Sequence, residues 1–157
     1  MTLPPLGPIT HITQHCTATP EGLDLSAAQI SAMDTKIFGQ VSYHYVVLLD
    51  GTLVQTLDTR FKGAHTGKRN TGNVGISYVG GIDRVTKQAK DTRTPAQKVT
   101  IAKFYRDMLA AHPGIIIQGH RDWSPDLDGD GKIEPNEWLK QCPCYDVKAW
   151  SAAGMPC

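Results

Sequence analysis

The chain contains no long apolar segment and almost no excess charge. None of its 157 residues lies in a run that approaches the roughly 18 apolar residues needed to span a bilayer. Its 16 basic and 15 acidic side chains give a formal net charge of +1, which does not require a polyanionic partner. We therefore expect neither stable membrane association nor nucleic-acid binding.

Signals of secretion are also missing, and cysteine is scarce. The opening segment MTLPPLGPITHITQH has neither a basic n-region nor a long apolar h-region, so we expect synthesis in the cytoplasm without a signal peptide. Such a chain favours free thiols or metal ligands over disulfides. The four cysteines are Cys16, Cys142, Cys144 and Cys157. Two of them stand in one Cys-Pro-Cys turn, a spacing that is awkward for a mutual disulfide.

What is present is an ordinary globular composition of a size suited to one domain. Hydrophobic residues make up 40% and charged residues 20% of the chain, which is not the composition of a disordered protein. A length of 157 residues accommodates one core, and no repeat or low-complexity linker divides the chain. We predict a single domain over residues 1–157.

Apolar and polar periodicity predicts strands that alternate with helices. Strands are expected over residues 9–15, 74–81 and 114–120, and a polar surface loop over 59–73. An Asp50-Gly51 turn joins the segments YHYVVLL and TLVQTL as a hairpin, and Asp-Gly suits a type I′ turn. This order predicts an α/β fold with a central mixed sheet flanked by helices.

Two helices carry explicit start signals. The first is predicted over residues 26–38, with Ser26 as its N-cap. The residues expected on its buried face are Ile30, Met33 and Ile37. The second begins at Thr94, where a proline in the first turn and a glutamine three residues after the threonine make a capping-box pattern.

Three residues have the chemistry of a zinc site. His15 and His120 each end an apolar strand, where loops converge, and Cys142 lies in a polar loop. Two imidazoles and a thiolate leave the fourth zinc position for a water, whose pKa zinc lowers to about 7. With six histidines and four cysteines in the chain, ordinary buried or surface roles for these side chains are the alternative.

Short sequence blocks follow one another in order over nearly the whole chain. They are TQHCTATP at 13–20, SYHYVV at 42–47, DGT at 50–52, GAH at 63–65, NVGISYVGG at 73–81, TPAQ at 94–97, GHRD at 119–122 and KQCP at 140–143. In this order they resemble the phage-type N-acetylmuramoyl-L-alanine amidases, relatives of the peptidoglycan recognition proteins. Each block is short, but the ordered set is specific.

The resemblance implies a zinc amidase that cuts the bond between N-acetylmuramic acid and L-alanine in peptidoglycan. It implies His15, His120 and Cys142 as zinc ligands, and it matches Tyr43 and Lys140 to a tyrosine and a lysine needed for catalysis. A lysine ammonium would stabilise the developing oxyanion, and a tyrosine hydroxyl would orient the attacking water or relay a proton. Without the resemblance, Tyr43 is an ordinary strand residue and Lys140 a solvated charge.

Other residues near these motifs receive less specific roles. His65, in the polar loop, is expected to line the cleft and contact substrate. His44 is expected on the opposite sheet face from Tyr43 and is assigned a structural role. A basic loop either attracts the carboxylates of a stem peptide or is simply solvated. Its members are Arg60, Lys62, Lys68 and Arg69.

The segment between His120 and Cys142 is much longer here than in the simplest members of the resembled family. The extra residues form an insertion. Residues 126–137 match an EF-hand calcium loop, with acidic groups at positions 1, 3 and 5, glycine at 6, isoleucine at 8 and glutamate at 12. The expected calcium ligands are Asp126, Asp128, Asp130, the backbone carbonyl of Lys132, and Glu137. We interpret calcium as structural, ordering the insertion and thereby positioning Lys140 and Cys142; a solvated acidic loop is the alternative.

Two other functions fit parts of the sequence. A non-catalytic peptidoglycan-binding module of the recognition-protein type would lack the cysteine ligand, and Cys142 is present. A calcium-regulated interaction protein would need paired EF-hands and an apolar groove, and the sequence indicates neither. We therefore expect a monomeric endolysin that accumulates in the host cytoplasm and reaches peptidoglycan at lysis, by analogy with single-domain endolysins of phages that infect Gram-negative hosts.

Overall fold

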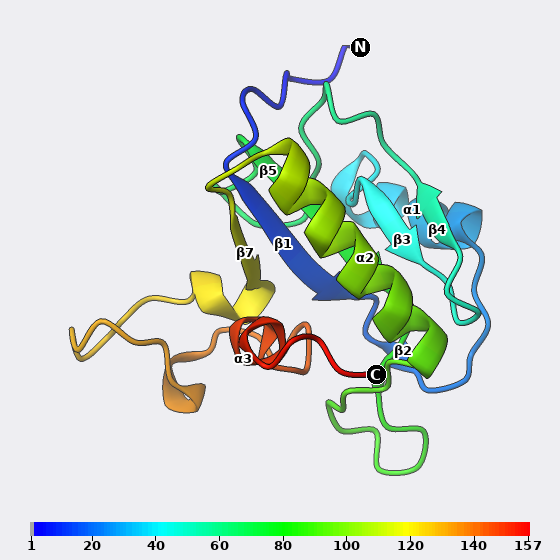
Figure 1. Ribbon diagram of the computed structural model, residues 1–157. Coiled ribbons are helices and arrows are strands. Elements are labelled where there is room, and N and C mark those ends of the chain that lie inside the picture. Colours follow the sequence, from blue (N-terminus) through cyan, green and yellow to red (C-terminus); the bar gives the residue numbers. More distant parts are fainter. Residues whose placement is uncertain (1) are drawn as a thin grey trace.

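A central five-stranded sheet organises the chain (Figure 1). The computed structural model describes residues 2–157, and its central strands lie in the order β4-β3-β5-β1-β7. These strands are β1 (His11–Cys16), β3 (Tyr45–Val47), β4 (Leu53–Gln55), β5 (Asn73–Tyr78) and β7 (Ile116–Gly119). Neighbours among β3, β5, β1 and β7 pair in parallel, and β4 joins the edge antiparallel to β3. The sheet is mixed, so the predicted α/β class is confirmed.

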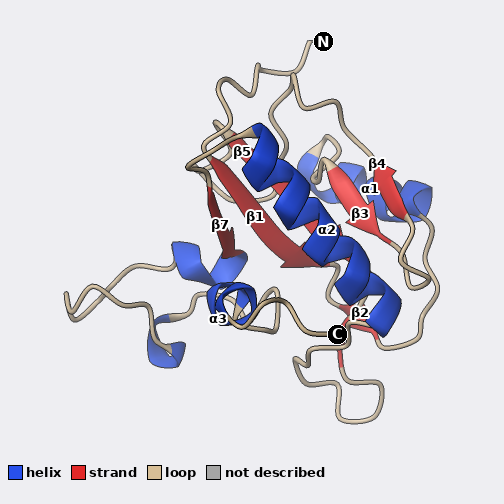
Figure 2. Cartoon of the chain, viewed as in Figure 1, coloured by secondary structure: helices blue, strands red, loops and turns tan. Residues whose placement is uncertain are grey.

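Helices cover both faces of this sheet (Figures 1 and 2). The long helix α2 (Pro95–Ala111) crosses the sheet in front of β1, and α1 (Ala27–Phe38) lies behind β3 and β4. The short α3 (Val147–Ala152) packs beside β7. The remaining elements are β2 (Thr19–Pro20), β6 (Gly81–Ile82) and the 3-10 helices η1 (His120–Trp123) and η2 (Pro135–Glu137). Within residues 2–157, no helix has the length and apolar character to cross a bilayer.

Both predicted helix starts are confirmed by their hydrogen bonds. The Ser26 hydroxyl accepts from the Gln29 N–H, and the Gln29 side chain accepts from the Ser26 N–H. Thr94 and Gln97 form the same reciprocal pair at the start of α2. Each box satisfies two amide donors that the first helical turn cannot pair internally. The buried Gln97 amide also donates to the backbone of β3 and to the Val79 carbonyl, which ties α2 to the sheet.

The predicted buried face of the first helix is partly wrong. Ile30 is buried, but Met33 and Ile37 are 47% and 72% exposed. The cause is the limited contact of α1, which packs through Ala27 and Ile30 against a small cluster at the β3 side of the sheet. The apolar spacing predicted the helix correctly, but it did not predict how many helical turns would pack against the sheet.

The predicted type I′ hairpin turn is also wrong. Gly51 has a φ of 87°, whereas Asp50 is not among the described residues with positive φ, which a type I′ turn would require. The Leu48 N–H donates to the Thr52 carbonyl, and the Gly51 N–H donates back to Leu48. The connection is therefore a three-residue loop with glycine at its left-handed position.

Arg93, just before the start of α2, holds the C-terminal segment through its contacts with Tyr145 and Trp150. Its guanidinium carbon lies 3.3 Å from the centroid of the Tyr145 ring and 4.4 Å from that of Trp150. It also donates to both carboxylate oxygens of Asp91 at 2.9 Å. The Arg93 side chain is only 3% exposed, so the ion pair and the two ring faces replace most of its hydration.

Replacing Arg93 with alanine is expected to lower the free energy of unfolding by about 2–4 kcal/mol, because Asp91 and two aromatic faces lose their cation. Urea denaturation followed by tryptophan fluorescence measures the loss. Arg106→Ala removes an exposed arginine from α2 and should cost less than about 0.5 kcal/mol. Equal stability of the two variants would contradict the role given to Arg93.

Candidate metal centre

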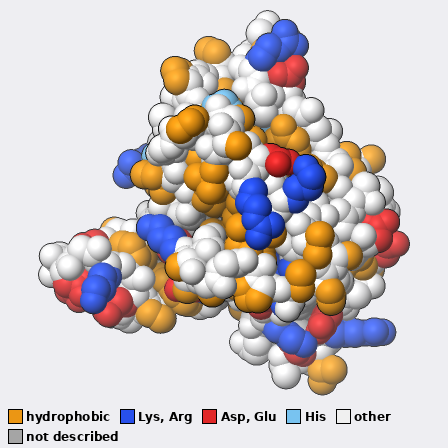
Figure 3. Space-filling model, in the orientation of Figure 1, with side chains coloured by type: hydrophobic (Ala, Val, Ile, Leu, Met, Phe, Trp, Pro, Cys, Tyr) orange, Lys and Arg blue, Asp and Glu red, His pale blue; other side chains and the backbone are white. Residues whose placement is uncertain are grey.

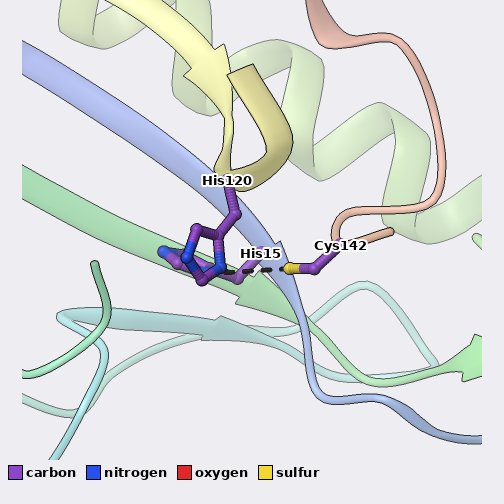
Figure 4. Close-up of side chains that lie close together, drawn as sticks. All are labelled: His15, His120 and Cys142. Carbon is purple, nitrogen blue, oxygen red and sulfur yellow. Dashed lines mark hydrogen bonds between the residues drawn. The ribbon is translucent and has the colours of Figure 1, made fainter. Parts of the chain in front are cut away.

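The three predicted ligands come from distant parts of the chain and meet at one edge of the sheet (Figure 4). His15 lies near the end of β1, His120 begins η1 directly after β7, and Cys142 lies in the loop before α3. One ligand atom from each lies within 4.8 Å of the others. Nδ1 of His15 is 3.7 Å from Sγ of Cys142, and the two imidazole centroids are 4.6 Å apart. The grouping expected from the sequence is present in the folded chain.

Parallel pairing of β1 with β7 brings the two histidines together. The register aligns Gln14 with Gly119, so His15 and His120 are the next residues along the two strands. The carboxyl ends of parallel strands lie at the same edge of a sheet, where side chains from separate loops converge. The local sequence therefore needs only to end each strand with a histidine for the pair to form.

Hydrogen bonds hold the Cys142 loop against this edge. The Arg121 N–H donates to the Cys142 carbonyl at 2.9 Å, and the Tyr78 hydroxyl donates to the Pro143 carbonyl at 2.7 Å. Gly119 permits this approach, since a Cβ there would lie 2.7 Å from Cδ of Pro143. The position of the thiol is thus determined by contacts of the loop backbone and Pro143 with β5, β7 and η1.

A buried hydrogen-bond chain orients His15. Nε2 of His65 lies 3.0 Å from the Asn73 carbonyl, which can only accept, so this nitrogen carries the proton. Nδ1 of neutral His65 then accepts from Nε2–H of His15, also at 3.0 Å. Nδ1 of His15 is then unprotonated, and its lone pair faces Sγ of Cys142 at 3.7 Å. Metal-binding histidines are commonly fixed in this way by a hydrogen bond from the second ring nitrogen.

Burial keeps these imidazoles neutral. It lowers the pKa of His65 to about 3 and the pKa of His120 to about 4, and it lowers the pKa of His15 well below its ordinary value. The charge of Lys140 lowers the pKa of His15 and His120 further. Neutral imidazole is the form that binds zinc, so protons compete little with a metal at neutral pH.

The centre opens onto a cleft of about 470 Å³. The side chains that give the cleft its character are the cations Lys140 and Arg69, the exposed apolar residues Phe38 and Leu139, and the rings of His65, His120 and Trp123. The Arg69 guanidinium lies 5.6 Å from the centroid of the Trp123 ring. Of the predicted basic loop, Arg69 reaches this lining, whereas Arg60 pairs with Asp58 at 3.0 Å.

His65 lines the cleft as expected, but its polar atoms face the protein interior. The residue is 7% exposed, and its nitrogens lie 3.0 Å from His15, from the Thr66 hydroxyl and from the Asn73 carbonyl. Gly75 provides the space for this ring, because a Cβ at that position would lie 2.7 Å from it. One of these partners is the candidate ligand His15, so His65 contacts the site from the protein interior.

Tyr43 and His44 both lie near the site histidines, which corrects the expected alternation of faces. The Tyr43 ring centroid is 5.2 Å from that of His15, and the His44 centroid is 5.8 Å from that of His65. Alternation fails because β3 begins only at Tyr45. Both His44 nitrogens are bonded to backbone, one at 2.8 Å to the carbonyl of residue 61 and one at 3.0 Å to the N–H of residue 75, which agrees with a structural role.

Asp34, on α1, was not identified from the sequence. Its Oδ2 atom is buried, with no hydrogen-bond partner among residues 2–157. Burial raises the pKa of Asp34 to about 6. Burial and then the charges of Cys142 and Asp34 raise the pKa of Tyr43, so the phenol stays protonated at neutral pH. A single aspartate in an amphipathic helix gives no sign in the sequence that its carboxylate will be buried, because only tertiary packing buries it.

The insertion projects from the domain as a separate lobe that carries acidic side chains and a lysine (Figure 3). The carboxylates of Asp126, Asp128 and Asp130 lie within 4.8 Å of one another. Glu137 is 3% exposed, and its carboxylate accepts from the Leu127 N–H at 2.6 Å, which brings loop position 12 back to the start of the loop.

Comparisons with known proteins agree with this architecture. A family profile described as N-acetylmuramoyl-L-alanine amidase matches residues 5–137. An endolysin of Klebsiella phage KP32 is 27% identical over 142 residues, which cover 90% of this chain and 84% of the endolysin. An uncharacterized protein of Haemophilus influenzae is 49% identical over 88 residues, or 56% of this chain and 75% of that protein.

Likeness to a solved structure supports the fold. The N-acetylmuramoyl-L-alanine amidase LysC from Clostridium intestinale has a TM-score of 0.72 at 14% identity, covering 99% of this chain and 92% of that chain. Lys140 and Cys142 lie beyond the residues that the family profile matches. Their assignment therefore depends on the resemblance of the segment at 140–143 and, for Cys142, on its place beside His15 and His120.

Asp34→Asn is expected to raise the melting temperature at about pH 7.5 and to leave it nearly unchanged at about pH 3.5. The carboxyl ionises near its ordinary pKa of 3.8 in the unfolded chain but only near 6 in the folded one, so ionisation at neutral pH costs stability. Below both pKa values the Asp34 carboxyl is protonated in the folded and in the unfolded chain, so its ionisation no longer lowers the stability. Thermal melts at the two pH values, with exposed Asp24→Asn as the control, test this; an equal effect at both values would refute it.

Proposed function

Because this chain belongs to the N-acetylmuramoyl-L-alanine amidase family, we propose that it hydrolyses its substrate with a zinc ion held by His15, His120 and Cys142. The chain is a peptidoglycan amidase with a lytic role, and it acts on the cell wall. The bond that gives the family its name joins N-acetylmuramic acid to L-alanine. Zinc, its ligands and the tasks of individual side chains extend this assignment.

The convergence of three ligand atoms is the observation that carries the zinc proposal. Its Nδ1 lone pair, the neutral imidazole of His120 and the thiol of Cys142 converge within 4.8 Å. Two imidazoles and one thiolate leave a fourth position open, as in catalytic rather than closed structural zinc sites. Zinc bound there would supply a Lewis acid for the scissile carbonyl and lower the pKa of a bound water.

Lys140 and Tyr43 flank these ligands with complementary chemistry. Lys140 lines the cleft, and its charge is near enough to His15 and His120 to lower their pKa. A cation at this place stabilises the negative charge that develops on the carbonyl oxygen. Tyr43 is held as a protonated phenol beside His15, so it serves as a hydrogen-bond donor that orients the reacting groups.

The cleft suits an anionic peptide attached to a sugar chain. Arg69 and Lys140 give it two cations, which complement the carboxylates of a peptidoglycan stem peptide. His65 supports the site from inside, because it holds the tautomer of His15, and its ring edge contributes to the cleft wall. We therefore propose that His65 positions the zinc ligand His15 and also borders the bound substrate.

Cys142→Ala is expected to lose bound zinc and about 10³-fold or more of the amidase activity, since one of three protein ligands is removed. The measurements are zinc content and mass spectrometry of products from purified peptidoglycan. Wild type should release stem peptides that begin with L-alanine and leave intact glycan strands. Cys157→Ala, at an exposed cysteine, should retain zinc and activity. Wall binding by wild type without any cleavage would instead support the non-catalytic recognition module.

Lys140→Met is expected to separate catalysis from metal binding. The variant should keep its zinc but lose about 10²–10³-fold in kcat, the usual effect of removing one oxyanion-stabilising group. Loss of zinc together with activity would mean that Lys140 serves the fold of the ligand loop instead.

We further propose that calcium binds the insertion through Asp126, Asp128, Asp130, the Lys132 carbonyl and Glu137. Support comes from the clustered carboxylates and from the return of Glu137 to the loop start. The base of the insertion is closed by Ser124, whose hydroxyl accepts from the Leu139 N–H at 3.0 Å, and Lys140 is the next residue. Calcium would therefore order the segment that leads into the catalytic cleft.

Glu137→Gln is expected to weaken calcium binding about tenfold or more, because the closing bidentate carboxylate becomes neutral. Calorimetric titration of calcium into zinc-loaded protein measures the affinity, and exposed Asp107→Asn provides the control. Calcium should also raise the melting temperature of wild type. Unchanged activity and melting temperature after calcium chelation, with zinc kept replete, would remove calcium from the proposal.

A further inference from the structure

Two cysteines beside the metal centre face each other and have no part in the proposed mechanism. Sγ of Cys16 lies 3.9 Å from Sγ of Cys144, although 128 positions separate them in the chain. Cys16 is the last residue of β1 and follows His15, whereas Cys144 stands two residues after Cys142. The sulfur pair thus connects the central strand with the ligand loop.

We propose that Cys16 and Cys144 form a disulfide when the protein enters an oxidising compartment, while Cys142 stays a thiol. The proximity of the two sulfurs is independent of catalysis. The expectation that the protein enters an oxidising compartment rests on the proposed function. Peptidoglycan lies outside the cytoplasmic membrane, where disulfides persist.

The local geometry permits this bond. The sulfurs, now 3.9 Å apart, must approach by about 2 Å to reach the usual S–S length. Gly81 borders the pair and leaves the required space, since a Cβ there would lie 2.5 Å from Cys16 Sγ. The Gly81 carbonyl accepts from the Cys144 thiol at 3.4 Å, a weak contact that oxidation would replace.

The same geometry separates Cys142 from the pair. Its sulfur is directed toward Nδ1 of His15 at 3.7 Å and accepts from the Cys16 N–H at 3.3 Å. Its spacing from Cys144, with one proline between them, is awkward for a bridge. A metal on the three candidate ligands would occupy this sulfur as well.

The oxidant is a small disulfide such as oxidised glutathione. Cys144, which is half-buried, attacks it first and forms a mixed disulfide, and the proton of Cys144 leaves with the released glutathione, which becomes a thiol. The sulfur of Cys16, 4% exposed and in contact with Cys144, then displaces the second glutathione as it gives up its own proton. Two cysteine thiols have lost two electrons, and one disulfide has become two thiols. The new bond ties the end of β1 to the loop that carries Lys140 and Cys142.

The test uses the zinc-loaded, full-length protein in a Cys157→Ser background, which prevents bridges between molecules through the exposed cysteine. The protein is brought to equilibrium with oxidised or reduced glutathione, denatured, alkylated and digested. Oxidised protein should lose the mass of two hydrogen atoms, keep one alkylated thiol at Cys142, and yield a peptide pair bridged between Cys16 and Cys144. Fragment-ion sequencing assigns the bridge within the peptide that contains both Cys142 and Cys144.

Oxidation should also raise the melting temperature by about 5–10 °C, because the bridge closes a long loop. Cys144→Ser in the same background should show no such rise. Full alkylation of all three thiols after equilibration with oxidised glutathione, or a bridge that includes Cys142, would overturn the proposal. Peptidoglycan cleavage is measured on the same samples, so failure of the amidase function would be visible without affecting the outcome for the bridge.

Discussion

The parallel pairing of β1 on both of its sides is the constraint on which the rest of the structure depends. Its residues align with β5 along the whole strand and with β7 over the first four positions. Five of its six residues are buried. A strand in this position must satisfy every polar side chain internally, because water reaches neither face. The candidate site is largely the result of that requirement.

The polar side chains of β1 divide between two networks. Gln14 faces α2, where its amide oxygen accepts from the Tyr105 hydroxyl at 2.7 Å. On the other face, Thr13 donates to Asn73 at 2.7 Å and accepts from the Trp123 indole at 2.9 Å. His15 belongs to this second face, and its partner His65 is bonded in turn to the Asn73 carbonyl. The bonds that satisfy a buried strand therefore also fix the orientation of a metal-binding imidazole.

The insertion is accommodated because its two ends are joined close to the sheet. The Arg121 guanidinium lies 3.8 Å from the centroid of the Trp138 ring, and Ser124 is bonded to the Leu139 N–H. Arg121 also bonds to the Cys142 carbonyl through its backbone. These contacts join the two ends of the projecting loop, so the distance between His120 and Cys142 does not depend on how far the loop extends.

Local sequence determined the features that depend on neighbouring residues. The capping boxes at Ser26 and Thr94, the α/β order of elements and the spacing of the acidic loop are all set within short segments, and the first two were predicted correctly. The three ligands were named from strand-end positions and from a family resemblance. Their approach could not be derived from spacing alone, because 126 positions separate Cys142 from Cys16, the neighbour of His15.

Only the tertiary structure decided the exposure of Met33 and Ile37, the inward hydrogen bonds of His65, the buried carboxylate of Asp34 and the contact between Cys16 and Cys144. Each depends on which surfaces of separate elements come together, and many arrangements of the same helices and strands would satisfy the local patterns equally well. The sequence by itself determined which elements form and which chemistry stands at their ends. The packing of β1 between β5 and β7 decided which of those groups meet, because pairing of distant strands is selected by the burial of the whole core.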